Sequence, residues 1–216
     1  MSFSKEITER AMKVDPALIG HYIEGGYMDL SIKPVDETFK VVGPAFTVQF
    51  AGRNPAMLSY AMRRAPKGSI LVIDRMGDTT FACIGEGMAR IAKSLNLAGI
   101  IINGPSTDTS GIKNLGLPVF STGASPVTTA RAKGEINGNY NLPVSCGGLV
   151  IRPGDIVFGD IDGVIVAPPE KFEALLEHAE KSTANEKEFF AKIETMNIRK
   201  EPLRSETDVE TFLNAK

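Results

Sequence analysis

The stretch SILVIDRMGDTTFACIGEGMARIAKSLNLAGIIIN, residues 69–103, decides the fold class of this chain. It opens with one short apolar run, SILVID, and closes with another, AGIIIN, and such runs are typical of strands buried on both faces. Between them, apolar side chains recur at helical spacing from about Gly85. This spacing places five side chains on one helix face: Ile84, Met88, Ile91, Ala92 and Leu95. Strand, helix and strand in this order predict a β-α-β unit of a parallel sheet.

The same alternation continues toward the N-terminus. VVGPAFTVQFAG, residues 41–52, predicts another strand, and NPAMLSYAMRRA, residues 54–65, predicts a helix. Asn54 suits the N-cap of this helix because its side-chain oxygen can accept a backbone N–H, and Pro55 suits the first helical position. The parallel sheet is therefore expected to extend over at least three strands.

Both ends of the chain are expected to be helical. Residues 4–24 carry the periodicity of two short helices, and the Gly25-Gly26 pair is expected to stop the second one. A charged helix is predicted over 169–195, followed by a loosely attached polar tail.

The segment between these helical ends becomes rich in strands after a short helix at about 110–115. LPVFSTG and LPVSCGGLVIRPGDIVFGDIDGVIVAP carry turn signals at Pro153-Gly154 and Asp162-Gly163, and we expect antiparallel strands that close the same core. The Asp160-x-Asp162 pair is interpreted as part of a hairpin turn, because it lacks the other ligands of a calcium loop. We expect one α/β domain over residues 1–216, made of a core at about 40–170, a helical N-terminal arm at 1–39, and a C-terminal helix and tail at 169–216.

Composition excludes several functional classes. The chain has 216 residues, 43% of them apolar and 23% charged, as in ordinary globular proteins. A net charge of -2 with mixed signs supplies no basic face for nucleic acid. There is no apolar run long enough for a membrane span, and the N-terminus MSFSKEITER does not resemble a secretory signal. We therefore expect a cytoplasmic protein that binds neither nucleic acid nor membrane.

Cysteine and histidine do not suggest a zinc or thiol site. Cys83 and Cys146 are far apart and are interpreted as buried thiols, and His21 and His178 have no metal-ligand or triad spacing. A metal in this protein would have oxygen ligands, which favours Mg²⁺ or Mn²⁺.

Two segments are candidates for chemistry. Gly85-Glu86-Gly87 begins a helix, where free N–H groups can bind an anion and missing side chains let a ligand approach, although tight packing is an alternative reason for the glycines. Asp108 follows the buried strand AGIIIN, at an edge of the sheet where ligands bind in α/β folds. As alternatives, Asp108 is an N-cap of the next helix, and Glu86 only complements the helix dipole. If both carboxylates lie at this edge, they can share one hard cation directly or through water.

The succession GPAFTV, Asn54, GEGMA, GIIINGPSTD, LPVF and GGLVIRPGDIVFGDIDGVIVAP, over about residues 40–170, resembles the RraA-like family. That family includes class II 4-hydroxy-4-methyl-2-oxoglutarate aldolases, which also decarboxylate oxaloacetate, and regulators of RNase E activity. The resemblance implies a swivelling β/β/α domain that assembles as a homotrimer or a homohexamer.

The resemblance also implies roles for individual residues. Gly85, Glu86, Gly87 and Met88 fall on the turn that binds the 2-oxo acid, together with Asn54 as a substrate-binding residue. Asp108 matches the metal-ligating aspartate, and Glu86 would act on the metal through water. A glutamate from the C-terminal helix of an adjacent subunit completes the site in the aldolases, and the nearest matches are Glu186 and Glu188.

One position departs from the family pattern. Thr107 stands where the motif Gly-x-x-Arg-Asp has an arginine that binds the substrate. Threonine offers only one hydroxyl, whereas arginine binds a carboxylate with two parallel hydrogen bonds. Arg53, Arg131 and Lys133 are alternative cations or solvated surface charges. The Asp74-Arg75 pair follows the buried strand SILVID. It either lines the ligand-binding cleft at the same edge of the sheet or forms a local ion pair.

The resemblance, together with these residues, implies a metal-dependent lyase for a small 2-oxo acid, acting by aldol cleavage or decarboxylation through an enolate that the metal stabilises. Glu86 and Asp108 are the catalytic candidates. Two alternatives stay open: a non-catalytic regulator that binds proteins, and a relative that carries out a different metal-assisted reaction.

Overall fold

The computed structural model describes residues 3–130, 134–197 and 206–214. Its main element is an eight-stranded sheet in the order β1-β5-β4-β3-β2-β9-β10, with β6 paired to β2. A separate pair is formed by β7 and β8. The strands are Lys33–Pro34 (β1), Val41–Gln49 (β2), Ile70–Asp74 (β3), Gly99–Asn103 (β4), Val119–Ser121 (β5), Asn139–Tyr140 (β6), Val144–Cys146 (β7), Leu149–Ile151 (β8), Ile156–Gly159 (β9) and Val164–Ala167 (β10).

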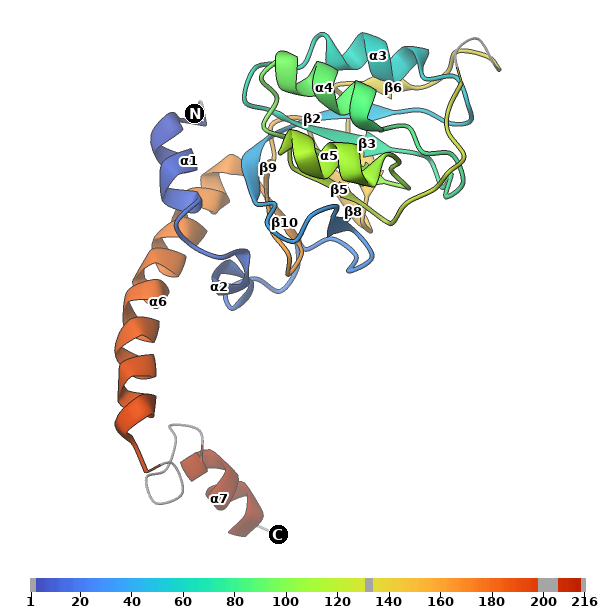
Figure 1. Cartoon of the computed structure of the whole chain (residues 1–216). Helices are drawn as coiled ribbons and strands as arrows, with labels where there is room; N and C mark the ends of the chain where they lie inside the picture. The colour runs from blue at the N-terminus through green and yellow to red at the C-terminus, as the bar shows by residue number, and fades with distance from the viewer. Residues whose placement is uncertain (1–2, 131–133, 198–205, 215–216) are drawn as a thin grey trace.

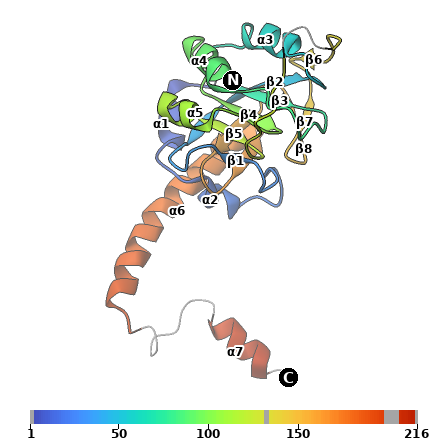
Figure 2. The ribbon, with the colours of Figure 1, turned by 45° about the vertical axis from the view of Figure 1, so that its right-hand side comes forward.

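Strands β2 to β5 run parallel, and three short helices return the chain between them. In Figures 1 and 2, α3, α4 and α5 lie on the same side of these strands. The helices are Lys5–Ala11 (α1), Pro16–Gly20 (α2), Ala56–Met62 (α3), Glu86–Ser94 (α4), Thr109–Leu115 (α5), Pro169–Thr195 (α6) and Glu206–Asn214 (α7).

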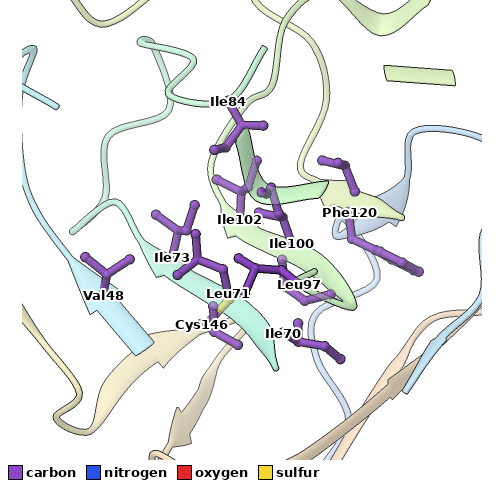
Figure 3. Close-up of a cluster of buried hydrophobic side chains, with 14 of the residues drawn as sticks. Val48, Ile70, Leu71, Ile73, Ile84, Leu97, Ile100, Ile102, Phe120 and Cys146 are labelled. Carbon is purple, nitrogen blue, oxygen red and sulfur yellow. The ribbon is translucent and has the colours of Figure 1, made fainter. Parts of the chain in front are cut away.

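The core is centred on β3 and β4, whose side chains at 70–73 and 100–102 are all fully buried. Ala89 and Ala92 of α4 cover one face of these strands, and Cys146 of β7 lies beside the other, close to Leu71 in Figure 3. Both faces are thus covered by protein, as expected for parallel strands that read as continuous apolar runs.

The sequence predicted most elements of the parallel half. The β-α-β units are confirmed, and α6 has the predicted bounds. The Asp160–Gly163 segment is the turn of the β9-β10 hairpin, as predicted, with the backbone N–H of Asp162 donating to the Asp160 carboxylate at 2.9 Å.

Four local predictions were wrong. Strand β5 is parallel to β4, because α5 returns the chain to the starting edge of the sheet. Ile91 is exposed on α4, since the strands below accept the two small alanines instead. Helix α2 already ends at Gly20, before the Gly25-Gly26 pair. The N-cap of α3 is Pro55 and not Asn54. Asn54 precedes the N-cap, and its side chain still accepts the Ala56 N–H at 3.1 Å.

Helix α6 is held at its N-terminal half and projects from the sheet beyond it (Figure 1). Its buried side chains are Phe172, Leu176 and Ala179. Arg10 of α1 donates two hydrogen bonds of 2.8 Å to Glu180, which lowers the pKa of that carboxyl. Helix α7 was not predicted from the sequence. Within the described residues, no helix is both long and apolar enough to cross a membrane.

Both cysteines are free and buried, as predicted, and burial raises the pKa of each thiol to about 12. Only the thiolate reacts readily with thiol reagents. We therefore expect Cys83 and Cys146 to resist a disulfide-exchange reagent at pH 8 in the folded protein and both to react at once in denaturant. Rapid labelling of either thiol without denaturant would show that the core opens around it.

Candidate active site

Three parallel strands end side by side at one edge of the sheet. Gln49, Asp74 and Asn103 are in register at the ends of β2, β3 and β4, so the loops that follow them start as neighbours. Gly85 and Asp108 close two of these loops at the N-termini of α4 and α5. This is the edge at which α/β sheets bind ligands.

Asp108 has an unusual backbone and an unusual hydrogen bond. Its φ and ψ angles are 54° and 42°, in the left-handed region that few residues other than glycine adopt. It occupies the N-cap position of α5, and its carbonyl accepts the Ile112 N–H at 3.0 Å, but its side chain does not cap that helix. Instead, Oδ2 accepts the backbone N–H of Glu86 at 3.1 Å. The exposed carboxylate is thereby held at the positive end of α4.

The two glycines of the turn have different surroundings. A Cβ added to Gly85 would overlap the Asp108 carboxylate and lie 2.8 Å from the Thr107 methyl group. A Cβ added to Gly87 would meet no atom within 4 Å. Tight packing therefore explains the first glycine and does not explain the second, which faces open space next to the helix N-terminus.

The Glu86 carboxylate turns away from its own backbone contact with Asp108. It accepts hydrogen bonds from Arg90 at 2.8 and 2.5 Å, and it lies against Gly111 of α5. The side chain is 37% exposed. Glu86 and Asp108 are thus joined through a backbone N–H, and Arg90 balances the charge of Glu86.

Asn54 and Met88 line a cavity of about 530 Å³ between α3 and α4. Besides accepting the Ala56 N–H, the Asn54 amide donates to the Gly134 carbonyl at 3.0 Å, so the loop orients it at both ends. Thr107 and Asp108 lie on the α5 side of the turn and are not among the residues that line this cavity. The turn that begins at Gly85 therefore stands between the cavity and the Asp108 carboxylate.

Arg75 forms a buried network that the sequence did not reveal. Its guanidinium donates to the carbonyls of Phe50 and Gly52 at 3.3 and 2.7 Å and pairs with Asp78. One interpretation of the sequence was a local ion pair between Asp74 and Arg75. The structure does not show this pair, because the Asp74 carboxylate accepts the N–H groups of Met76 and Ser145. Burial raises the pKa of Asp78, but backbone N–H groups and Arg75 outweigh it and leave the pKa below its usual value. The network joins the loops after β2 and β3, and within the Arg75 guanidinium only the buried Nε has no hydrogen-bond partner among the described residues.

The remaining candidates lie elsewhere. Glu186 and Glu188 belong to the half of α6 that projects from the sheet, away from α4 and α5 in Figure 1. Arg131 and Lys133 lie outside the described residues.

The donors at this edge suit a hard cation. Among the described residues, no three His, Cys, Asp or Glu side chains gather into a metal-binding group. One exposed aspartate with a second carboxylate nearby is instead the kind of protein donor set that Mg²⁺ or Mn²⁺ uses, because such ions keep several waters.

Comparison with known proteins agrees with the fold. Residues 17–166 match the RraA-like family, described as Aldolase/RraA, and the chain belongs to that family. A protein of Halalkalibacterium halodurans named "Putative 4-hydroxy-4-methyl-2-oxoglutarate aldolase" is 44% identical over 157 residues, which are 72% of this chain and 73% of that protein. Other similar proteins, from Bacillus cereus and Bacillus anthracis, carry the same aldolase name.

Other similar proteins have different names. Protein DlpA of Legionella pneumophila is 31% identical over 170 residues, 76% of this chain but only 27% of that protein, so the chain corresponds to about a quarter of it. The crystal structure of Streptomyces coelicolor RraAS2, described as an unusual member of the RNase ES inhibitor RraA family, aligns with a TM-score of 0.72 at 27% identity. That alignment covers 91% of this chain and 99% of RraAS2. The proteins that this chain resembles therefore carry two kinds of name, that of an aldolase and that of an RNase inhibitor.

The two glycines allow a matched test of the Asp108 contact. We expect Gly85→Ala to displace the Asp108 carboxylate and to weaken Mn²⁺ binding at least tenfold, because the added methyl overlaps the carboxylate. Gly87→Ala adds the same methyl in open space and should retain wild-type Mn²⁺ affinity. Calorimetric titration of both folded variants gives the comparison. Equal affinities would mean that Mn²⁺ does not depend on the position of Asp108.

Proposed function

We propose that this chain is a divalent-metal-dependent lyase that acts on a small 2-oxo acid, by aldol cleavage or by decarboxylation of the oxaloacetate type. The observation that carries the proposal is the Asp108 carboxylate, which is held at the N-terminus of α4 while it leaves its own helix uncapped. The family and the aldolase named among its relatives support the same reaction class.

Each residue at the sheet edge has a separate role in the proposed reaction. Asp108 would hold the metal, with Glu86 acting through water. When bound, the metal supplies Lewis-acid polarisation of the 2-oxo group as negative charge develops there. The N–H groups of Gly87 and Met88 lie in the first turn of α4, have no acceptor within that helix, and are suited to bind the substrate carboxylate. Asn54 binds substrate from the cavity side, and Thr107 contributes one hydroxyl.

An adjacent subunit would complete this site. The projecting half of α6 carries Glu186 and Glu188. Because this half leaves its own sheet, its glutamates could reach a metal site only on another subunit of an oligomer. We propose a homotrimer or a homohexamer in which one of these glutamates joins the metal site.

Two alternative functions are compatible with the same fold. A regulator that binds a protein partner is supported by the similarity to RraAS2, and it would not need a metal. A different metal-assisted reaction is supported by Thr107, which lacks the charge of the arginine expected there. An activity that depends on metal would distinguish either enzyme from the regulator. Turnover of a 2-oxo acid would then distinguish the lyase from an enzyme with a different metal-assisted reaction.

The decisive experiment is a screen of 2-oxo acids, including oxaloacetate, for release of pyruvate in the presence of Mg²⁺ or Mn²⁺. We expect turnover that EDTA abolishes. Asp108→Asn should lower the rate at least a hundredfold, because it removes the anionic metal ligand with little change in size. Asp162→Asn, at an exposed position in the β9-β10 turn, is the matched control and should keep the wild-type rate.

Absence of turnover with all acids would contradict the lyase proposal and favour the regulator. Turnover that survives EDTA, or that is equal in the wild type and Asp108→Asn, would contradict the metal role of Asp108.

A further inference from the structure

The cavity between α3 and α4 has mainly apolar walls. Its volume of about 530 Å³ lies within the range of sites that bind small molecules. The apolar part of its lining comes from both helices and from the loop before α3, and it consists of Pro55, Ala56, Met62, Met88 and Ile91. A ligand in this cavity would therefore be in contact mostly with carbon atoms.

Ile91 is exposed at the wall of this cavity. The side chain is 46% exposed, because Ala89 and Ala92 are the residues of α4 that face the sheet. Met88 lies three positions earlier, so both side chains share one face of α4, and both line the cavity. Single exposed apolar side chains are common on protein surfaces. Two that lie together in a hollow form the kind of apolar patch that a ligand covers.

Few charged groups reach this cavity. Arg63 is the one charged residue among the described residues that line it, and it is exposed, so its guanidinium can stay in water. Arg53 does not line the cavity; its guanidinium lies 4.9 Å from the centre of the Phe81 ring. Arg90 is paired with Glu86. The lining thus suits an uncharged chain better than a second carboxylate, which would lose water on entering.

Met88 joins the cavity to the proposed substrate-binding turn. The Asp108 carboxylate accepts the N–H of Glu86, the first residue of α4, and Met88 is the third residue of the same helix. At 1.5 Å per residue these two positions are about 3 Å apart along the helix axis. Gly87 lies between them, and a Cβ added to it would meet no atom within 4 Å. A ligand carboxylate on the N–H groups of Gly87 and Met88 therefore has the Asp108 carboxylate on one side and the cavity on the other.

We infer that the cavity between α3 and α4 binds the apolar chain of a 2-oxo acid and thereby selects acids with a branched aliphatic chain over pyruvate and over dicarboxylic 2-oxo acids. This inference rests on the proposed function, since it assumes that the carboxylate and the 2-oxo group lie at the turn and at Asp108. Met62 and Met88 adapt to chains of different shape because methionine is unbranched and flexible. Ile91 supplies a more rigid part of the wall.

The test compares three 2-oxo acids by calorimetry at saturating Mg²⁺. The probes are pyruvate, 4-methyl-2-oxopentanoate and 2-oxoglutarate. We expect the wild type to bind 4-methyl-2-oxopentanoate roughly 10- to 50-fold more tightly than pyruvate, because its three additional carbon atoms become buried. The chain of 2-oxoglutarate would bring a carboxylate into the same apolar space, so this acid should bind no more tightly than pyruvate.

Variants of Ile91 test whether the cavity is responsible. Ile91→Gln, which keeps the size but makes the wall polar, should reduce the preference for 4-methyl-2-oxopentanoate over pyruvate at least fivefold. Ile91→Leu should keep the preference because the wall stays apolar. Ile161→Gln is the matched control, since Ile161 is 44% exposed in the β9-β10 turn, and it should also keep the preference. Because Ile91 is exposed, all three variants are expected to fold.

Three results would overturn the inference. In the first, the wild type binds pyruvate and 4-methyl-2-oxopentanoate equally, which would leave the cavity to another occupant, such as the exposed Phe189 or Phe190 of a second copy. In the second, the wild type prefers 2-oxoglutarate. In the third, Ile91→Gln keeps the wild-type preference or weakens both acids equally. A wild type that binds none of the three acids would overturn the proposed function as well, and this is recognised before any variant is made.

Discussion

Burial of β3 and β4 on both faces is the constraint on which the rest of the structure depends. Because the side chains at 70–73 and 100–102 are fully buried, each strand needs cover on both sides, and helices that return the chain provide it on one side. Parallel strands in register then end together at Asp74 and Asn103. The loops that carry Asn54, Gly85 and Asp108 are brought together by this arrangement of the core.

The second requirement is the contact between Asp108 and the N-terminus of α4. An aspartate in the left-handed region costs conformational free energy, on the order of 1–3 kcal/mol. Its hydrogen bond to the Glu86 N–H and the helix dipole offset part of that cost. Gly85 makes the contact possible because it has no side chain where the carboxylate lies. The same geometry leaves the N–H groups at the next two positions of α4 available for a ligand.

The sequence predicted the parallel half of the fold because apolar runs and helical spacing are local signals. It gave β5 the wrong direction, since a three-residue strand carries no sign of its direction. It placed Ile91 on the apolar face of α4, although Ile91 is exposed, because only the packed sheet selects Ala89 and Ala92. Asp108 and the glycine turn were chosen correctly as neighbours. Their roles in binding, and the single domain, stay predictions. The Arg75 network joins three segments distant in sequence, so no local pattern indicates it.

The central claim is that the metal and the 2-oxo acid bind together at the edge formed by Asp108 and α4. Two ligands that share a site affect each other's affinity by the same factor. The most direct measurement is therefore the affinity for Mn²⁺ with and without saturating pyruvate, obtained by calorimetric titration of the wild-type protein. The account predicts that pyruvate strengthens Mn²⁺ binding at least fivefold and that Mn²⁺ strengthens pyruvate binding equally. Identical Mn²⁺ affinities with and without pyruvate would contradict it.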